Sequence, residues 1–143
     1  RTALKYADTT PCFYYRGLVP AKWTQAPAQD AYEYYAEYFK AGEVHQQLYT
    51  DGSGGPDTAD PRKRRVAWAV AEIDNDMEVC AVKAGNMPEG KQTVPRSEIQ
   101  AAIVAVGMAI PGLVDIYTDS DIVYKCWHNH ERKTNEDLWA LVE

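Results

Sequence analysis

The sequence lacks any apolar run long enough to cross a membrane, which takes about 20 residues. Its longest apolar stretch, residues 99–114, is interrupted by a glutamine, two glycines and a proline. We therefore expect neither a membrane-spanning segment nor a membrane partner.

Cysteine is also scarce. The three cysteines, Cys12, Cys80 and Cys126, are far apart in the chain, and no two of them have the CxxC spacing of a zinc site. An odd, scattered set does not form the disulfide framework of a small secreted protein. The sequence therefore favours an intracellular, reducing compartment, without indicating which one.

Positive charge is in deficit as well. The chain has 15 Lys and Arg residues against 21 Asp and Glu residues, which gives a formal net charge of −6. This balance argues mildly against a protein that binds nucleic acid through a broad basic face. A group of carboxylates can nevertheless hold a metal ion, and the bound cation then reverses the local electrostatics.

The length and composition indicate a single globular domain. The chain has 143 residues, of which 45% are hydrophobic and 25% are charged, close to the globular average. Its first residue is Arg rather than Met, so we expect a processed chain or part of a longer one.

The first 46 residues differ in composition from the rest. Prolines interrupt residues 1–27, which we expect to form an irregular arm. Residues 31–40, AYEYYAEYFK, fit a short helix, because Tyr32, Tyr35 and Phe39 would share one apolar face. We expect this helix to pack on the main domain or on a neighbour, and the alternative is a stacking platform for nucleic acid.

The remaining residues, 47–143, show strand patterns followed by helix patterns. We expect strands at 47–50, 66–73, 77–84 and 114–118, and helices at 97–109, 120–127 and 138–142. The order β-β-β-α-β-α-α predicts an α/β domain with a mixed sheet flanked by helices.

Three acidic residues stand at the ends of these elements. Asp51 and Asp119 each end a strand, and Glu98 lies in the first turn of the helix between those strands. Each position alone is common in turns or at helix starts. Together the three carboxylates would converge at one edge of the sheet, which is costly without a cation. A hard divalent cation with oxygen ligands is the natural occupant.

Four segments resemble type 1 ribonuclease H, especially the ribonuclease H domains of retroelement polyproteins. They are LYTDGSGG (48–55), TVPRSEIQAAIVAV (93–106), VDIYTDSDIVYKCW (114–127) and, more weakly, NEDLWALV (135–142). The first three contain Asp51, Glu98 and Asp119 in the order of the family. The resemblance covers about two thirds of the chain and implies the ribonuclease H-like fold over residues 47–143.

The resemblance also implies a chemistry. Ribonucleases H of this type hydrolyse the RNA strand of RNA–DNA hybrids with two divalent ions, Mg²⁺ or Mn²⁺. By this likeness Asp51 would bridge both ions, and Glu98 and Asp119 would each help to hold one.

Several polar residues are candidate contacts to the hybrid. Ser53 follows the first acidic motif, and its alternative role is turn chemistry. Arg96 precedes Glu98, and its alternative is a solvated loop charge. The basic cluster Arg62, Lys63, Arg64 and Arg65 could touch phosphates, or it could be a solvated loop beside neighbouring acids.

The sequence departs from the family pattern in three places. The family continues with a further strand, a His-bearing loop and a helix carrying a fourth metal-binding Asp, none of which has a counterpart before Glu143. We expect an open strand edge, covered by a continuation of the chain, a separate chain or a larger assembly. Val94 and Pro95 replace the Asn or Gln of many members, and the link 128–134 is short.

Three functions remain open from the sequence. The first is a two-metal endonuclease acting on RNA–DNA hybrids, which the three intact acidic motifs favour. The second is a non-catalytic ribonuclease H-like domain that serves as a structural or docking subunit. The third is a different nuclease or an integrase relative on the same fold, because fold does not fix function.

Overall fold

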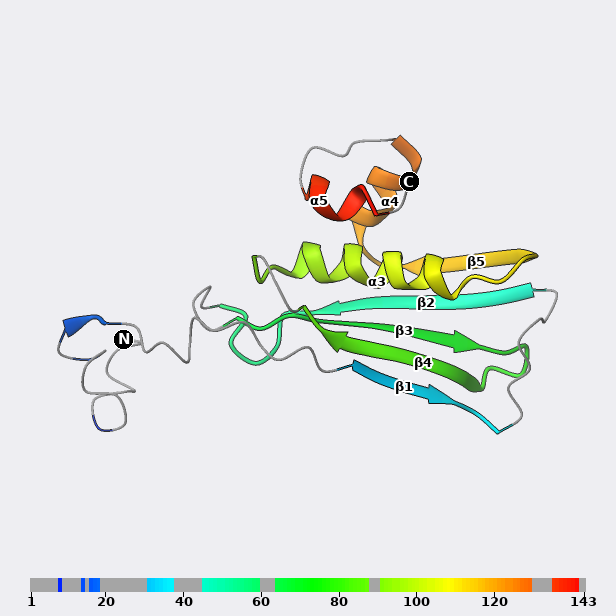
Figure 1. The fold of residues 1–143 in the computed structure, drawn as a ribbon, viewed down its shortest axis with the longest axis horizontal. Coiled ribbons are helices and arrows are strands. Elements are labelled where there is room, and N and C mark those ends of the chain that lie inside the picture. The colour runs from blue at the N-terminus through cyan, green and yellow to red at the C-terminus, as the bar shows by residue number, and fades with distance from the viewer. Residues whose placement is uncertain are drawn as a thin grey trace.

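A computed structural model describes residues 8, 14, 16–18, 31–37, 45–59, 64–87, 91–129 and 135–141. Its centre is a mixed sheet of five strands in the order β1-β4-β3-β2-β5 (Figure 1). The strands are β1 (Ala31–Tyr35), β2 (His45–Ser53), β3 (Ala67–Ile73), β4 (Val79–Asn86) and β5 (Leu113–Thr118). β5 runs parallel to β2, and the other neighbouring strands are antiparallel.

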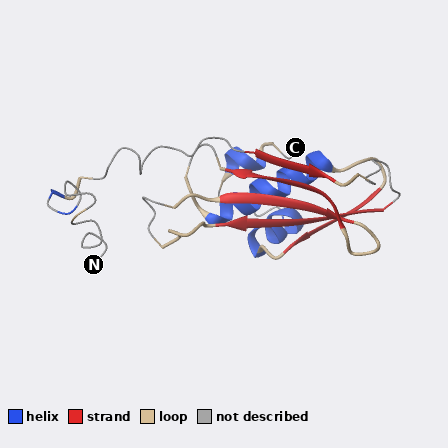
Figure 2. Ribbon diagram, turned by 90° about the horizontal axis from the view of Figure 1, so that it is seen from below, coloured by secondary structure: helices blue, strands red, loops and turns tan. Residues whose placement is uncertain are grey.

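Three helices lie on one face of this sheet (Figure 2). They are α3 (Val94–Met108), α4 (Asp121–Asn129) and α5 (Glu136–Trp139). α3 packs on β2 and β3 through the small buried side chains of Ala101, Ala102 and Ala105, so the helix can lie close to the sheet. No helix of the described residues is long and apolar enough to span a membrane.

The α/β class and the mixed sheet predicted from the sequence are confirmed. The three-stranded meander, the crossover helix and the next parallel strand are present in the expected order. α3 begins at Val94, three residues earlier than predicted, because Pro95 is compatible with a first helical turn, where no backbone N–H is required.

The helix predicted for residues 31–40 is wrong. Residues 31–35 instead form β1, which pairs antiparallel with β4 from Ala31 opposite Gly85 to Tyr35 opposite Ala81. The tyrosines favour extended backbone, and the edge of β4 supplies hydrogen-bonding groups that an isolated short helix does not have. Tyr32 and Tyr35 are exposed, so the expected apolar face does not form, and Phe39 lies outside the described residues.

Candidate metal centre

The structure brings Asp51, Glu98 and Asp119 together. The parallel pairing of β2 with β5 places Thr50 opposite Thr118. Asp51 and Asp119 directly follow these threonines, so the pairing places the two aspartates at the same edge of the sheet. Glu98 reaches the same point from the first turns of α3. One carboxylate oxygen from each residue lies within 4.8 Å of the other two.

Gly52 permits this close approach of helix and strand. A Cβ atom at position 52 would lie 2.7 Å from the backbone nitrogen of Glu98 and 2.7 Å from Ser97 Oγ. Real Cβ atoms do not approach other atoms so closely, so any side chain here would push α3 away from β2. The residue after the first aspartate therefore controls the position of Glu98.

Glu98 is buried, whereas Asp51 and Asp119 are exposed. Burial, followed by the nearby charges of Asp119 and Asp51, raises the pKa of Glu98 to about 7, and the backbone N–H of Gly52 opposes this rise. The Glu98 Oε2 atom has no hydrogen-bond partner among the described residues. The folded chain thus holds a carboxylate oxygen that is both desolvated and unsatisfied, which is unfavourable without a ligand.

These features fit a divalent cation. All three side chains supply the hard oxygen donors that Mg²⁺ and Mn²⁺ prefer. A cation would satisfy the buried Glu98 oxygen and would neutralise the mutual repulsion of the three carboxylates.

Two hollows adjoin the exposed aspartates of the site. One, of about 500 Å³, is lined by Asp51, Asp119, Tyr124 and His128, among others. The other, of about 540 Å³, reaches Asp51 and Ser53 from the side of β3 and β4. The site is therefore open to a ligand on the side where the two aspartates are exposed.

Tyr124 and His128 were not expected at the site from the sequence. Their rings stack with centroids 4.2 Å apart on consecutive turns of α4, and His128 Nδ1 lies 3.0 Å from the carbonyl oxygen of Tyr124. The i, i+4 spacing of Tyr124 and His128 is the sequence feature from which the contact between their rings could have been predicted.

Ser53 is the last residue of β2, and Arg64 and Arg65 of the basic cluster lie just before β3. The Ser53 hydroxyl accepts a hydrogen bond from the Gly55 N–H at 3.2 Å, as turn chemistry requires, although Ser53 also lines the 540 Å³ hollow. The guanidinium of Arg64 donates to the carbonyl of Thr58, and that of Arg65 donates to the carbonyl of Arg64. Arg62 and Lys63 lie outside the described residues.

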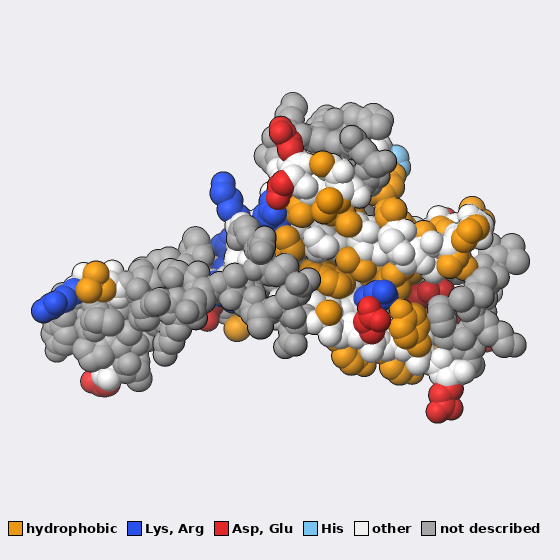
Figure 3. Space-filling view, viewed as in Figure 1, with side chains coloured by type: hydrophobic (Ala, Val, Ile, Leu, Met, Phe, Trp, Pro, Cys, Tyr) orange, Lys and Arg blue, Asp and Glu red, His pale blue; other side chains and the backbone are white. Residues whose placement is uncertain are grey.

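Basic side chains of the described residues cover no broad area of the face drawn in Figure 3. A few Lys and Arg side chains lie near one another to the left of the helices and others stand alone, whereas hydrophobic side chains are gathered over α3 and the strands. This distribution agrees with the acidic balance of the whole sequence.

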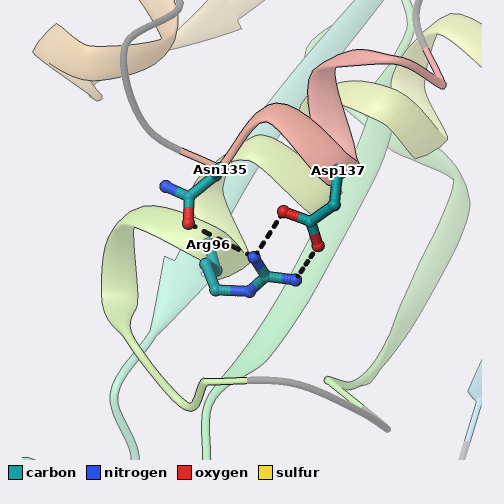
Figure 4. Close-up of polar contacts among 3 residues, drawn as sticks. All are labelled: Arg96, Asn135 and Asp137. Atoms are coloured by element: carbon teal, nitrogen blue, oxygen red, sulfur yellow. Dashed lines mark hydrogen bonds and ion pairs between the residues drawn. The ribbon is translucent and has the colours of Figure 1, made fainter.

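Arg96 lies in the first turn of α3 and is buried. Its side chain is only 10% exposed and forms an ion pair with Asp137 of α5, with a further hydrogen bond to Asn135 (Figure 4). The alternative of a solvated loop charge is therefore wrong, whereas a contact of Arg96 with nucleic acid stays a prediction. Nη1 and Nη2 of its guanidinium are engaged by Asp137 and Asn135, and its Nε has no hydrogen-bond partner among the described residues. A cation in the first turn of a helix opposes the helix dipole, which was the available signal for a specific acidic partner.

The fold and the site together define an α/β domain with a candidate acidic metal centre at the ends of two neighbouring parallel strands. The RNase H family model matches residues 43–141, and the chain belongs to the RNase H family. Among curated proteins none matches the chain.

Two solved structures resemble the chain. The foamy viral protease-reverse transcriptase in complex with dsDNA matches with a TM-score of 0.52 and 22% identity over 70% of this chain and 72% of that one. The prototype foamy virus protease-reverse transcriptase (native) matches with a TM-score of 0.47 and 23% identity over 68% of this chain and 15% of that one. The first likeness shows the same fold.

Proposed function

We propose that this chain is a metal-dependent endonuclease that hydrolyses the RNA strand of RNA–DNA hybrids. One observation carries the proposal: the carboxylates of Asp51, Glu98 and Asp119 converge within 4.8 Å, with a buried oxygen of Glu98 left unpartnered. Membership of the RNase H family supports a hybrid as the substrate class.

The three carboxylates would hold two Mg²⁺ or Mn²⁺ ions. Asp51, Glu98 and Asp119 would each supply a carboxylate oxygen as a ligand. When bound, the ions supply Lewis acidity for attack of water on a phosphodiester and for departure of the leaving oxygen.

The residues themselves set the conditions for this chemistry. Before a cation binds, the negative charge of Asp51 and Asp119 repels a phosphate group from the adjoining hollow. Binding of the hybrid therefore depends on binding of the cation. Glu98 must lose its proton to act as a ligand, and its raised pKa makes this loss pH-dependent near neutrality.

A second function, a non-catalytic structural or docking subunit, is favoured by the edge strand β5. Within the described residues β5 pairs only with β2, and Leu113 and Tyr117 on it are 62% and 42% exposed. Exposed apolar side chains on an unpaired strand edge suit a protein partner.

Hydrolysis of labelled duplexes separates these functions. We expect the folded chain with Mg²⁺ or Mn²⁺ to cut the RNA strand of an RNA–DNA hybrid, to leave the DNA strand intact, and to stop when EDTA removes the metal. Double-stranded DNA and double-stranded RNA of the same sequence are the matched controls. Equal cutting of all duplexes would indicate a different nuclease, and no cutting by folded protein would favour the structural subunit.

A further inference from the structure

The first turn of α3 leads directly into Glu98, yet no side chain caps that turn. Thr93 at the N-cap makes no side-chain hydrogen bond to the helix, and only its carbonyl accepts bonds from the N–H groups of Arg96 and Ser97. An uncapped first turn frays easily. Glu98 therefore depends on contacts from outside the helix for its position.

Two contacts hold this turn from different elements. Gly52 of β2 packs against Ser97 and Glu98, as described above. Arg96 connects the turn to α5: its Nη1 donates to Asp137 Oδ1 at 2.9 Å, and its Nη2 donates to Asp137 Oδ2 at 2.7 Å (Figure 4). Such a bidentate pair fixes orientation as well as distance.

Asn135 completes the contact. Its side-chain oxygen accepts a third hydrogen bond from Arg96 Nη1 at 3.3 Å. Asn135 has a left-handed backbone with φ of 58°, which non-glycine residues adopt only where surrounding contacts stabilise it. The hydrogen bonds from Arg96 also lower the pKa of Asp137, so Asp137 stays charged.

α5 has only four residues, but buried side chains fix its position. Leu138 and Trp139 are buried in the same apolar cluster as Ile99 of α3, together with Val66 and Val123. The Asp137 side chain is 62% exposed and forms the ion pair with Arg96, while Leu138 and Trp139 pack α5 into the core. α5 thereby connects the apolar core to the turn that leads into Glu98.

We propose that Asp137 and Asn135 are positioning residues of the metal centre, which act through Arg96 to set the orientation of the Glu98 carboxylate. The inference rests on the proposed metal site and extends it to an element that contributes no ligand. Without this contact the first turn of α3 would move about Gly52 and the three oxygens would no longer converge.

Mn²⁺ affinity tests the proposal without reference to activity. By calorimetric titration of folded protein, we expect Arg96→Gln to weaken Mn²⁺ binding about tenfold, the range for a residue that orients a ligand. Removing a nearby positive charge would by electrostatics alone strengthen cation binding. The direction of the change therefore separates positioning from charge.

Two further variants complete the test. Asp137→Asn alters the exposed end of the pair and serves if Arg96→Gln does not fold. Because loss of this exposed charge also weakens cation binding by electrostatics, Asp137→Asn is titrated at high salt, where screening removes that effect and a weakening of about tenfold is still expected. Glu33→Gln is the matched control, because it breaks the ion pair of Lys83 with Glu33 on β1, and it should leave the affinity unchanged.

The outcomes are distinct. Unchanged or tighter Mn²⁺ binding in both Arg96→Gln and Asp137→Asn, with wild-type binding that Asp51→Asn abolishes, would overturn the positioning role and leave the metal site intact. A wild-type chain that binds no Mn²⁺ would overturn the metal site and this inference together.

Discussion

Replacing Asp51 by Asn is expected to reduce metal-dependent cleavage of an RNA–DNA hybrid by about 10³-fold or more. Asn has nearly the same shape as Asp, so the pairing of β2 with β3 should be kept while one negative ligand is lost. Stabilisation by a catalytic metal is worth several kcal/mol, and each 1.36 kcal/mol is tenfold in rate. Initial rates on a labelled hybrid, at metal concentrations that saturate the wild type, measure this loss.

Asp76→Asn is the control for this variant. Asp76 is an exposed aspartate in the turn between β3 and β4, on a different part of the chain from the three carboxylates. The Asp76→Asn variant should cleave the hybrid at the wild-type rate. A rate for Asp51→Asn within about tenfold of the wild type would show that Asp51 is not a ligand essential to catalysis.

Without metal, the wild-type chain is expected to lose stability as the pH rises from 5 to 8, and Glu98→Gln is expected to lose less. The pKa of Glu98 is raised to about 7 in the folded chain, from an ordinary value near 4.5 in the unfolded one. Between these values the folded state binds the proton that the unfolded state releases, so the free energy of unfolding falls with increasing pH. The expected fall from this group is on the order of 2 kcal/mol.

Urea denaturation in EDTA at pH 5 and pH 8 measures this effect. The comparison uses the difference between wild type and Glu98→Gln at each pH, which removes the contribution of all other titrating groups. Glu98→Gln should gain stability relative to the wild type at pH 8, because a neutral amide carries no charge into the buried site. The same difference at both pH values would contradict the raised pKa.

Much of the fold could be predicted from the sequence because its signals are local. The Asp-Gly pair near the end of β2 and the Asp-Ser pair after β5 indicate where these strands finish, and the small residues of α3 indicate a helix that lies close to a sheet. Since β2 and β5 are parallel neighbours, the two aspartates had to meet at one edge once the topology was correct.

β1 could not be predicted in this way. Its five residues contain a spacing that fits a helix, and only the free edge of β4 makes the strand favourable. That edge exists only in the folded sheet, so no local pattern reports it. The tyrosines that suggested an apolar helix face are exposed.

The surroundings of Glu98 were the part of the site that the sequence did not show. Gly52 lies within β2, and its contact with α3 depends on the packing of helix against strand. Arg96 and Asp137 are 41 residues apart in the chain, and their pairing depends on where α5 docks. Long-range contacts of this kind leave only indirect signals, such as a cation at the start of a helix.

The most direct test of the central claim is anomalous diffraction from crystals of this chain soaked in Mn²⁺. We expect anomalous density enclosed by the carboxylates of Asp51, Glu98 and Asp119, and no such density in crystals of Asp51→Asn. Well-ordered carboxylates with no anomalous density between them, at Mn²⁺ concentrations that support catalysis in the family, would contradict the assignment of this site as a metal centre.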